Sequence, residues 1–238
     1  MEDVLKAKEI LENARYAVFF GGAGVSTDSG IPDFRSSGGV YGGSESNEYY
    51  LSNACLRNDP IAFFRFYRGN MLYPNAKPND THLALARLEQ QGKLKAVITQ
   101  NIDGLHQKAG SKKVIELHGT TERYYCGRCG KLYPPEAIEG EAIPRCEKCG
   151  GIIRPDVTLY GESLSSSAFY DAEEEIANAD VLIVGGTSLT VQPAASFVGQ
   201  FRGDHLIIIN RAPTPYDGMA EIVIREGLSE VFRQLSNL

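Results

Sequence analysis

The 238-residue chain has no tryptophan, three methionines and four histidines, and it lacks any long apolar run. A membrane helix needs about 20 consecutive apolar residues, and no stretch approaches that length. The opening MEDVLKAKEILENAR lacks the basic-then-apolar order of a secretory signal and instead spaces its apolar residues as a helix does. The sequence therefore predicts a soluble, cytoplasmic protein that begins with an amphipathic helix.

Positive charge is also in short supply, because 24 Lys and Arg stand against 30 Asp and Glu and give a formal net charge of −6. Non-specific nucleic-acid binding is driven by basic surface, so we expect no direct nucleic-acid partner. With 42% hydrophobic residues the composition excludes a largely disordered or coiled-coil chain. The length suits one large domain, or one large and one small domain.

Short apolar runs alternate with segments of helical spacing along most of the chain. The apolar runs cover residues 16–20, 95–99, 113–117, 181–184 and 206–209, and the helical segments cover 81–91, 166–179, a stretch opened by Pro193, and 228–235. This alternation predicts an α/β fold, a Rossmann-like parallel sheet with helices on both faces. Ligands of such sheets bind beyond the carboxyl ends of the strands, so the chemistry is expected at residues 21–35, 100–106, 186–192 and 210.

Two stretches interrupt this alternation. Residues 36–73 begin rich in Gly and Ser and then become helical, and residues 121–153 hold four paired cysteines. We expect these stretches to form a small inserted domain, a helical module plus a zinc-ribbon module. Residues 1–35, 74–120 and 154–238 then form the large domain.

The paired cysteines have the spacing of a metal site. Cys126 and Cys129 form one CxxC pair, and Cys146 and Cys149 form a second one sixteen residues later. Four thiolates complete a tetrahedral zinc sphere and leave no open position, which indicates a structural role. A dithiol redox pair would not need two such motifs. Cys55 lies outside the cluster and is expected to be a small buried hydrophobe.

A glycine-rich turn follows the first apolar run. Gly22 and Gly24 match the start of a GxGxxG dinucleotide-binding turn, but Thr27 occupies the third glycine position. Glycines allow main-chain N–H groups to approach a pyrophosphate. Taken alone, this pattern is equally typical of a tight turn between a strand and a loop.

The motifs that follow closely resemble those of the sirtuins, the NAD-dependent protein deacylases. They are GAGVSTDSGIPDFR (22–35), TQNIDGLH (99–106), His118-Gly119, the four cysteines, RPDV (154–157), Gly161-Glu162, GTSL (186–189) and Ile209-Asn210. They occur in the family's order over nearly the whole chain. The resemblance implies two cofactors, NAD and zinc.

The resemblance also assigns site residues. Its catalytic residues are His118, Asn101, Asp103 and Arg35, and His118 is further favoured because it follows an apolar run at the ligand side of the predicted sheet. His82, His106 and His205 are expected to be structural. The implied NAD-binding residues are Gly22, Ala23, Gly24, Thr27, Asp28, Asp33, Phe34, Arg35, Gln100, Asn101, Ile102, Asp103, His118, Gly186, Thr187, Ser188, Asn210 and Arg211. The sequence does not identify the residue near 225–228 that closes the adenine end of the site. The implied substrate residues are Thr158, Tyr160, Gly161, Glu162 and Val191.

The implied activity is NAD-dependent protein-lysine deacetylation, in which the acetyl group moves to ADP-ribose and nicotinamide is released. The partner is an acetylated lysine on a protein or peptide that adds a strand to the enzyme. Relatives that remove malonyl or succinyl groups carry a Tyr-x-x-Arg pair, and Asn70 stands where that Arg would fall, so a neutral acyl group is expected. A protein ADP-ribosyltransferase with the same pocket and a non-catalytic NAD-sensing module are the alternatives.

Overall fold

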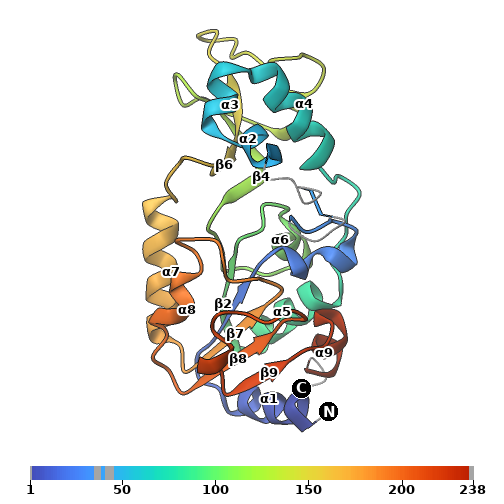
Figure 1. Cartoon of the computed structure of the whole chain (residues 1–238), viewed down its shortest axis with the longest axis vertical. Coiled ribbons are helices and arrows are strands. Elements are labelled where there is room, and N and C mark those ends of the chain that lie inside the picture. The colour runs from blue at the N-terminus through green and yellow to red at the C-terminus, as the bar shows by residue number, and fades with distance from the viewer. Residues whose placement is uncertain (1, 35–38, 41–45, 236–238) are drawn as a thin grey trace.

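A computed structural model of the chain describes residues 2–34, 39–40 and 46–235 (Figure 1). Within these residues the largest element is a six-stranded parallel sheet with the order β3-β2-β1-β7-β8-β9. Its strands are β1 (Ala17–Gly21), β2 (Leu94–Thr99), β3 (Val114–Glu116), β7 (Val181–Gly185), β8 (His205–Ile209) and β9 (Ile222–Ile224). This is the strand order of a doubly wound dinucleotide-binding sheet, so the expected Rossmann-like fold is confirmed.

Hydrophobic side chains fill both faces of this sheet. Successive side chains of a strand point to opposite faces, and in β1 Phe19 joins one core cluster while Val18 and Phe20 join another. Figure 1 shows the helices that cover the two faces. They are α1 (Glu2–Asn13), α5 (Asp80–Gln90) and α9 (Leu228–Leu235) on the first cluster, and α7 (Ser166–Asn178) and α8 (Ser196–Gln200) on the second. Burial on both faces explains why these strands are nearly continuous apolar runs in the sequence.

Local capping signals set the bounds of α5. The side-chain oxygen of Asn79 accepts a hydrogen bond from the Thr81 N–H at 3.0 Å, and the chain leaves the helix through Gly92, whose φ is +75°. Asparagine before the first turn and glycine after the last turn are both common capping signals of helices.

The helix that was expected to open at Pro193 begins instead at Ser196. Residues 191–195 form a turn, in which the Ala195 N–H donates to the carbonyl of Val191 at 2.8 Å. Proline suits the first position of a helix, but it suits a turn equally well. The local sequence therefore did not distinguish the two.

The helical and the cysteine-containing stretches pack together at one end of the large sheet (Figure 1). Their elements are β4 (Gly119–Cys126), β5 (Leu132–Tyr133) and β6 (Ile153–Val157) in an antiparallel sheet of order β5-β4-β6, with α2 (Ser46–Tyr50), α3 (Asn53–Asn58) and α4 (Pro60–Asn70). We call these six elements the small lobe. One hydrophobic cluster joins Phe63 and Tyr67 of α4 to Tyr124 of β4 and Ile153 of β6. The small lobe therefore has a core separate from the two clusters on the large sheet.

The remaining elements are short. They are α6 (Leu105–Ala109) and the 3₁₀ turns Ala23–Val25, Thr27–Ser29, Pro135–Ile138 and Asp217–Met219. Among the described helices, none is long and apolar enough to cross a membrane.

Candidate active site and metal centre

A cavity of about 690 Å³ lies beyond the carboxyl ends of the parallel strands. Its size is typical of a site for a small molecule or cofactor. Arg35 lies outside the described residues, and every other residue to which the sequence assigned NAD or substrate lines this cavity. These are Gly22, Ala23, Gly24, Thr27, Asp28, Asp33, Phe34, Gln100, Asn101, Ile102, Asp103, His118, Thr158, Tyr160, Gly161, Glu162, Gly186, Thr187, Ser188, Val191, Asn210 and Arg211.

Two loops meet at the floor of the cavity so closely that their contact requires glycine. The Gly24 N–H donates to the carbonyl of Gly186 at 2.8 Å, and a Cβ on Gly24 would stand 2.8 Å from the Gly186 Cα. Gly186 has a φ of +61°, a conformation that L side chains rarely adopt. The glycines thus serve loop-to-loop packing as well as the ligand approach that the sequence suggested.

Main-chain donors along this floor fit the pyrophosphate of a dinucleotide. Within the described residues, the N–H groups of Ala23, Thr187 and Ser188 find no hydrogen-bond acceptor. Gln100 ties the loop after β2 to the same floor, because its Nε2 donates to Thr187 Oγ1 at 3.0 Å. Unpaired N–H groups beside a glycine-rich turn provide a binding site for anionic oxygens.

Ser26 lies at the centre of a hydrogen-bonded cluster that holds Asn101 and Asp103. The Ser26 hydroxyl donates to Asp103 Oδ2 at 2.6 Å and accepts from Asn101 Nδ2 at 3.1 Å. The other Asp103 oxygen accepts the Leu105 N–H at 2.9 Å. These bonds fix the carboxylate and the amide in one orientation at the cavity wall. Ser26 was not among the predicted site residues, although it lies within the glycine-rich motif.

His82 extends this cluster from α5, and its buried, hydrogen-bonded position agrees with the structural role expected from the sequence. His82 Nδ1 lies 3.2 Å from the main-chain nitrogen of Asn79 and 3.1 Å from Asn79 Oδ1, and Nε2 lies 3.5 Å from Ser26 Oγ. Burial lowers the pKa of His82 to about 4, although the negative charge of Asp103 acts in the opposite direction. The imidazole is therefore neutral near pH 7. No sequence spacing links residue 82 to residue 26, because only the packing of α5 brings them together.

His106 packs on His82, with ring centroids 4.7 Å apart. It is 1% exposed, and burial lowers its pKa well below the ordinary value. It does not belong to the cavity lining. This position agrees with the scaffold role expected from the sequence.

His118 lies in the turn between β3 and β4 and lines the cavity. Its Nδ1 is 2.9 Å from the carbonyl oxygen of Gln100. A carbonyl can only accept, so the neutral ring carries its proton on Nδ1 and leaves the lone pair on Nε2. Burial lowers the pKa of His118 by more than this hydrogen bond raises it. The result is a neutral imidazole that can take a proton at Nε2.

The residue after His118 must be a glycine. Gly119 has a φ of +77°, and a Cβ there would collide with the carbonyl oxygen of Asp156. This close approach joins the start of β4 to β6. It therefore sets the turn that carries His118.

Beyond β8 the cavity is closed by Asn210 and by residues near 225–228, the range that the sequence left unassigned. Asn210 Nδ2 donates to the Ala212 carbonyl at 2.8 Å, and Arg225 donates to the Asn210 carbonyl at 2.9 Å. Glu226 and Leu228 complete the lining at this end.

The small lobe contributes the opposite wall through α4. Tyr67 and Asn70 line the cavity. The Tyr67 and Tyr124 hydroxyls are 3.1 Å apart, and Asn70 Nδ2 donates to the Phe66 carbonyl at 2.9 Å. Within the described residues no arginine lines this wall.

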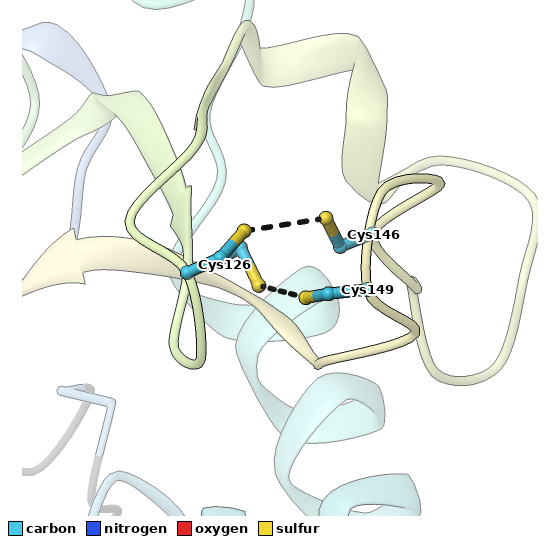
Figure 2. Close-up of side chains that lie close together, drawn as sticks. Cys126, Cys146 and Cys149 are labelled. Atoms are coloured by element: carbon cyan, nitrogen blue, oxygen red, sulfur yellow. Dashed lines mark hydrogen bonds between the residues drawn. The ribbon is translucent and has the colours of Figure 1, made fainter.

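The four paired cysteines form a separate centre in the small lobe. Figure 2 shows Cys126, Cys146 and Cys149 converging, and the four sulfur atoms, including that of Cys129, all lie within 4.8 Å of one another. The Cys126–Cys149 and Cys129–Cys146 sulfur distances are 3.4 and 3.7 Å. Zinc bound at about 2.3 Å to four thiolates places sulfur atoms roughly 3.8 Å apart, so the cluster fits zinc.

Surrounding groups support the thiolate form of these ligands. The Tyr133 hydroxyl donates to Cys146 Sγ at 3.1 Å and lowers the pKa of that thiol to about 6. The Arg128 N–H lies 3.4 Å from Cys126 Sγ. Outer hydrogen bonds of this kind orient metal ligands and keep them deprotonated.

Comparisons with known proteins agree with this geometry. The family model described as "Sir2 family" matches residues 22–193. An NAD-dependent protein deacetylase of Clostridium perfringens is 49% identical over 97% of this chain and 98% of its own, and one of Cutibacterium acnes is 52% identical over 92% of both.

Solved structures agree as well. A Sir2 structure with a deacetylated p53 peptide and 3′-O-acetyl ADP ribose superposes with a TM-score of 0.91 at 39% identity, covering 98% of this chain and 97% of the other. A Sir2 structure with a p53 peptide and NAD+ gives a TM-score of 0.87 at 40% identity, with coverage of 98% and 96%. The chain therefore belongs to the Sir2 family.

Proposed function

We propose that this chain is an NAD-dependent protein-lysine deacetylase that transfers the acetyl group to ADP-ribose and releases nicotinamide and O-acetyl-ADP-ribose. One observation carries the proposal: a single cavity brings His118, Asn101 and Asp103 together with the glycine floor between β1 and β7. The names of the relatives, NAD-dependent protein deacetylase, support the same activity.

We assign the floor of the cavity to the pyrophosphate of NAD. Gly22, Ala23, Gly24, Thr187 and Ser188 supply main-chain groups and hydroxyls there. The adjoining wall with Asn210 and Arg211 takes the adenosine, and Thr27, Asp28, Gln100 and Gly186 complete the floor and its sides.

We assign Asn101, Ile102 and Asp103 to the nicotinamide and its ribose, and Phe34 to the shielding of the reacting face. Asp33 is assigned a role near the nicotinamide ribose, and so is Arg35, which lies outside the described residues. The Ser26 cluster supports this assignment, because it fixes the Asn101 amide and the Asp103 carboxylate before any ligand binds. Preorganised polar groups of this kind lower the cost of reorganisation during the reaction.

Bound NAD would supply an electrophilic ribose carbon, with nicotinamide as its leaving group and the acyl oxygen of the substrate as the nucleophile. We assign His118 as the general base, with Nε2 accepting a proton from a ribose hydroxyl. The Gln100 carbonyl supports this role, since it holds the tautomer in which Nε2 is unprotonated. No nucleophilic side chain is required.

The acetyl-lysine peptide is assigned to the wall formed by residues 158–162, which adjoins His118, and by the loop at Val191. Thr158 and Tyr160 flank the acyl-lysine, and the main chain at Gly161 and Glu162 and the loop at Val191 pair with the extended peptide. The wall at Asn70 has no cationic side chain among its described residues, which supports a neutral acyl group.

We assign residues 1–35, 74–120 and 154–238 to an NAD-binding domain, and residues 36–73 and 121–153 to a small domain held by zinc. The separate hydrophobic cluster of the small lobe supports a two-domain division, although the small lobe also takes in Gly119, Thr120 and residues 154–157 through β4 and β6. A cytoplasmic location suits four thiolates that serve as metal ligands. The acidic net charge supports the absence of a nucleic-acid partner.

The test is to incubate the protein with NAD and an acetyl-lysine peptide and to analyse the products by mass spectrometry. O-acetyl-ADP-ribose together with deacetylated peptide supports the proposal. ADP-ribose attached to protein without deacetylation would indicate a transferase instead. NAD binding without either product would indicate a sensor.

A further inference from the structure

A partly buried ion pair lies at the wall that we assign to the peptide. Arg154 of β6 and Glu162 form two parallel hydrogen bonds, Nη1 to Oε1 at 2.6 Å and Nη2 to Oε2 at 2.8 Å. Their side chains are 11% and 20% exposed. Burial raises the pKa of Glu162, but the hydrogen bonds from Arg154 and the Leu159 N–H outweigh it and hold the carboxylate ionised.

The remaining hydrogen bonds of the pair go to the chain between its two members. Arg154 Nη2 donates to the Val157 carbonyl at 2.9 Å, and the Leu159 N–H donates to Glu162 Oε2 at 2.9 Å. The Glu162 N–H in turn donates to the Leu159 carbonyl at 2.9 Å. The guanidinium also lies over the Tyr125 ring, 5.5 Å from its centroid. Apart from the bonds between them, the two side chains therefore form hydrogen bonds with the main chain of the bend from Val157 to Glu162.

The main chain of the same bend also forms hydrogen bonds with two other segments, at His118 and at residues 51–53. The Thr158 N–H donates to the His118 carbonyl at 2.9 Å. The Tyr160 N–H donates to the Leu51 carbonyl at 3.1 Å, and the Tyr160 carbonyl accepts the Asn53 N–H at 3.0 Å. These bonds use the main chain of alternate residues on the inner side of the segment.

The next residues present a main-chain edge that nothing in the described chain occupies. Gly161 and Ser163 are exposed, and in the ranges that the structure covers their N–H and carbonyl groups form no hydrogen bond. Gly161 lines the cavity, has a φ of +84°, and has open space around the position of a Cβ. An extended peptide can form main-chain hydrogen bonds with such an edge only if the backbone of the edge keeps this conformation.

We propose that Arg154 and Glu162 are positioning residues, whose ion pair holds the bend from Val157 to Glu162 so that Gly161 and Ser163 stay presented to the acetyl-lysine peptide. The inference rests on the proposed function. Neither side chain touches the reacting atoms in this account. A partly buried pair with bidentate geometry suits this task, because it fixes geometry more than it adds net stability.

The inference predicts an effect on peptide binding that is separate from NAD binding. In Glu162→Ala, Arg154 loses its partner and the bend loses the bond at Leu159, so the peptide KM rises about tenfold to a hundredfold. The NAD dissociation constant and kcat stay within about threefold. Glu162→Gln keeps the shape and an acceptor oxygen, so its peptide KM lies between those of the wild type and Glu162→Ala.

Steady-state kinetics with an acetyl-lysine peptide and calorimetric NAD titration measure these values. Arg123→Met is the matched control, because Arg123 also pairs with a β6 residue, Asp156 at 2.9 Å, but bonds to no residue of the bend. Its peptide KM should stay within twofold. If Glu162→Ala does not fold, Glu162→Gln and Arg154→Lys carry the test, and each should raise the peptide KM by about threefold or more.

A peptide KM within twofold of the wild type in the folded variants would overturn the inference. An equal loss of NAD and peptide binding would overturn it as well, since that result indicates a general structural role. A wild-type protein that binds NAD but neither binds nor deacetylates the peptide would instead contradict the proposed function. The two failures are therefore distinguishable.

Discussion

The metal centre and the cavity are both built on loops, but they collect their residues over very different lengths of chain. All four sulfur ligands lie between Cys126 and Cys149, whereas the cavity lining runs from Gly22 to Leu228. Two CxxC turns and one short sheet bring the ligands together. The cavity forms only when the strands of the large sheet are assembled in their order.

The two regions also differ in what holds them. In the metal centre a single ion can satisfy four thiolates at once, so most of its stability is expected to depend on that ion. The floor of the cavity is instead held by many hydrogen bonds, such as those of Ser26 and Gln100, on a sheet with its own core. The metal centre should therefore lose its structure in one step when the ion is removed. In the cavity floor, the loss of one hydrogen bond should weaken the structure only locally.

Zinc removal gives the largest expected effect and tests this difference directly. Structural zinc contributes on the order of 10 kcal/mol to the folding of small zinc modules, so chelation should unfold the small lobe around Cys126–Cys149 and abolish turnover. Hydrogen exchange should show protection lost in β4–β6 and retained in β1, β2, β7 and β8, with recovery on adding zinc. Full turnover by a protein shown to be metal-free would contradict the structural role of the centre.

Replacing His118 tests whether the chemistry of the cavity depends on one side chain while binding is shared by many. His118→Ala should lower kcat about 10²- to 10⁴-fold, because the general base is lost, and should leave the NAD dissociation constant within about threefold. His205→Ala is the matched control, since His205 is partly exposed and pairs with Glu221. Deacetylation by His118→Ala at a near-normal rate would contradict the assignment of His118 as the general base.

The pH dependence of stability tests the buried histidine behind the cavity. Unfolded His82 binds a proton below pH 6.5, whereas folded His82 binds one only below about pH 4. Between these values the unfolded state holds more protons, so the free energy of unfolding falls as the pH is lowered through this window. From pH 7 to pH 5 the contribution of His82 is about 2 kcal/mol.

Urea unfolding of the wild type and His82→Gln at pH 7 and pH 5 measures this contribution. The variant should lose about 2 kcal/mol less stability on acidification, while buried His106 keeps its own contribution in both proteins. Equal losses in the two proteins would show that His82 titrates normally.

The smallest expected effect concerns the wall contributed by the small lobe. Asn70→Arg should raise kcat/KM on succinyl-lysine peptides by about threefold to tenfold, because a cation at the cavity wall pairs with the acyl carboxylate. Activity on acetyl-lysine should fall slightly. An unchanged preference for succinyl over acetyl peptides would mean that residue 70 does not face the acyl group.

The sequence allowed several elements to be predicted because their signals are local. The apolar runs at 16–20, 95–99 and 181–184 correspond to β1, β2 and β7, and the segment 228–235 corresponds to α9. The start of α8 was placed too early, since proline is compatible with both a turn and a helix start. Ser26 was missed as a site residue, and the sequence around Ser26 and His82 holds no signal that the two lie side by side in the fold.

By itself, the sequence determined the four-cysteine metal site, the alternation that gives a parallel sheet, and the family motifs at the strand ends. These features depend on spacing within a few residues or on the burial of short apolar runs, which the order of residues states directly. Only the tertiary structure decided that His82 reaches Ser26, that the proton of neutral His118 lies on Nδ1, and that Glu162 pairs with Arg154. Those facts depend on contacts between segments far apart in the chain, and such contacts exist only once the sheet and the small lobe have packed.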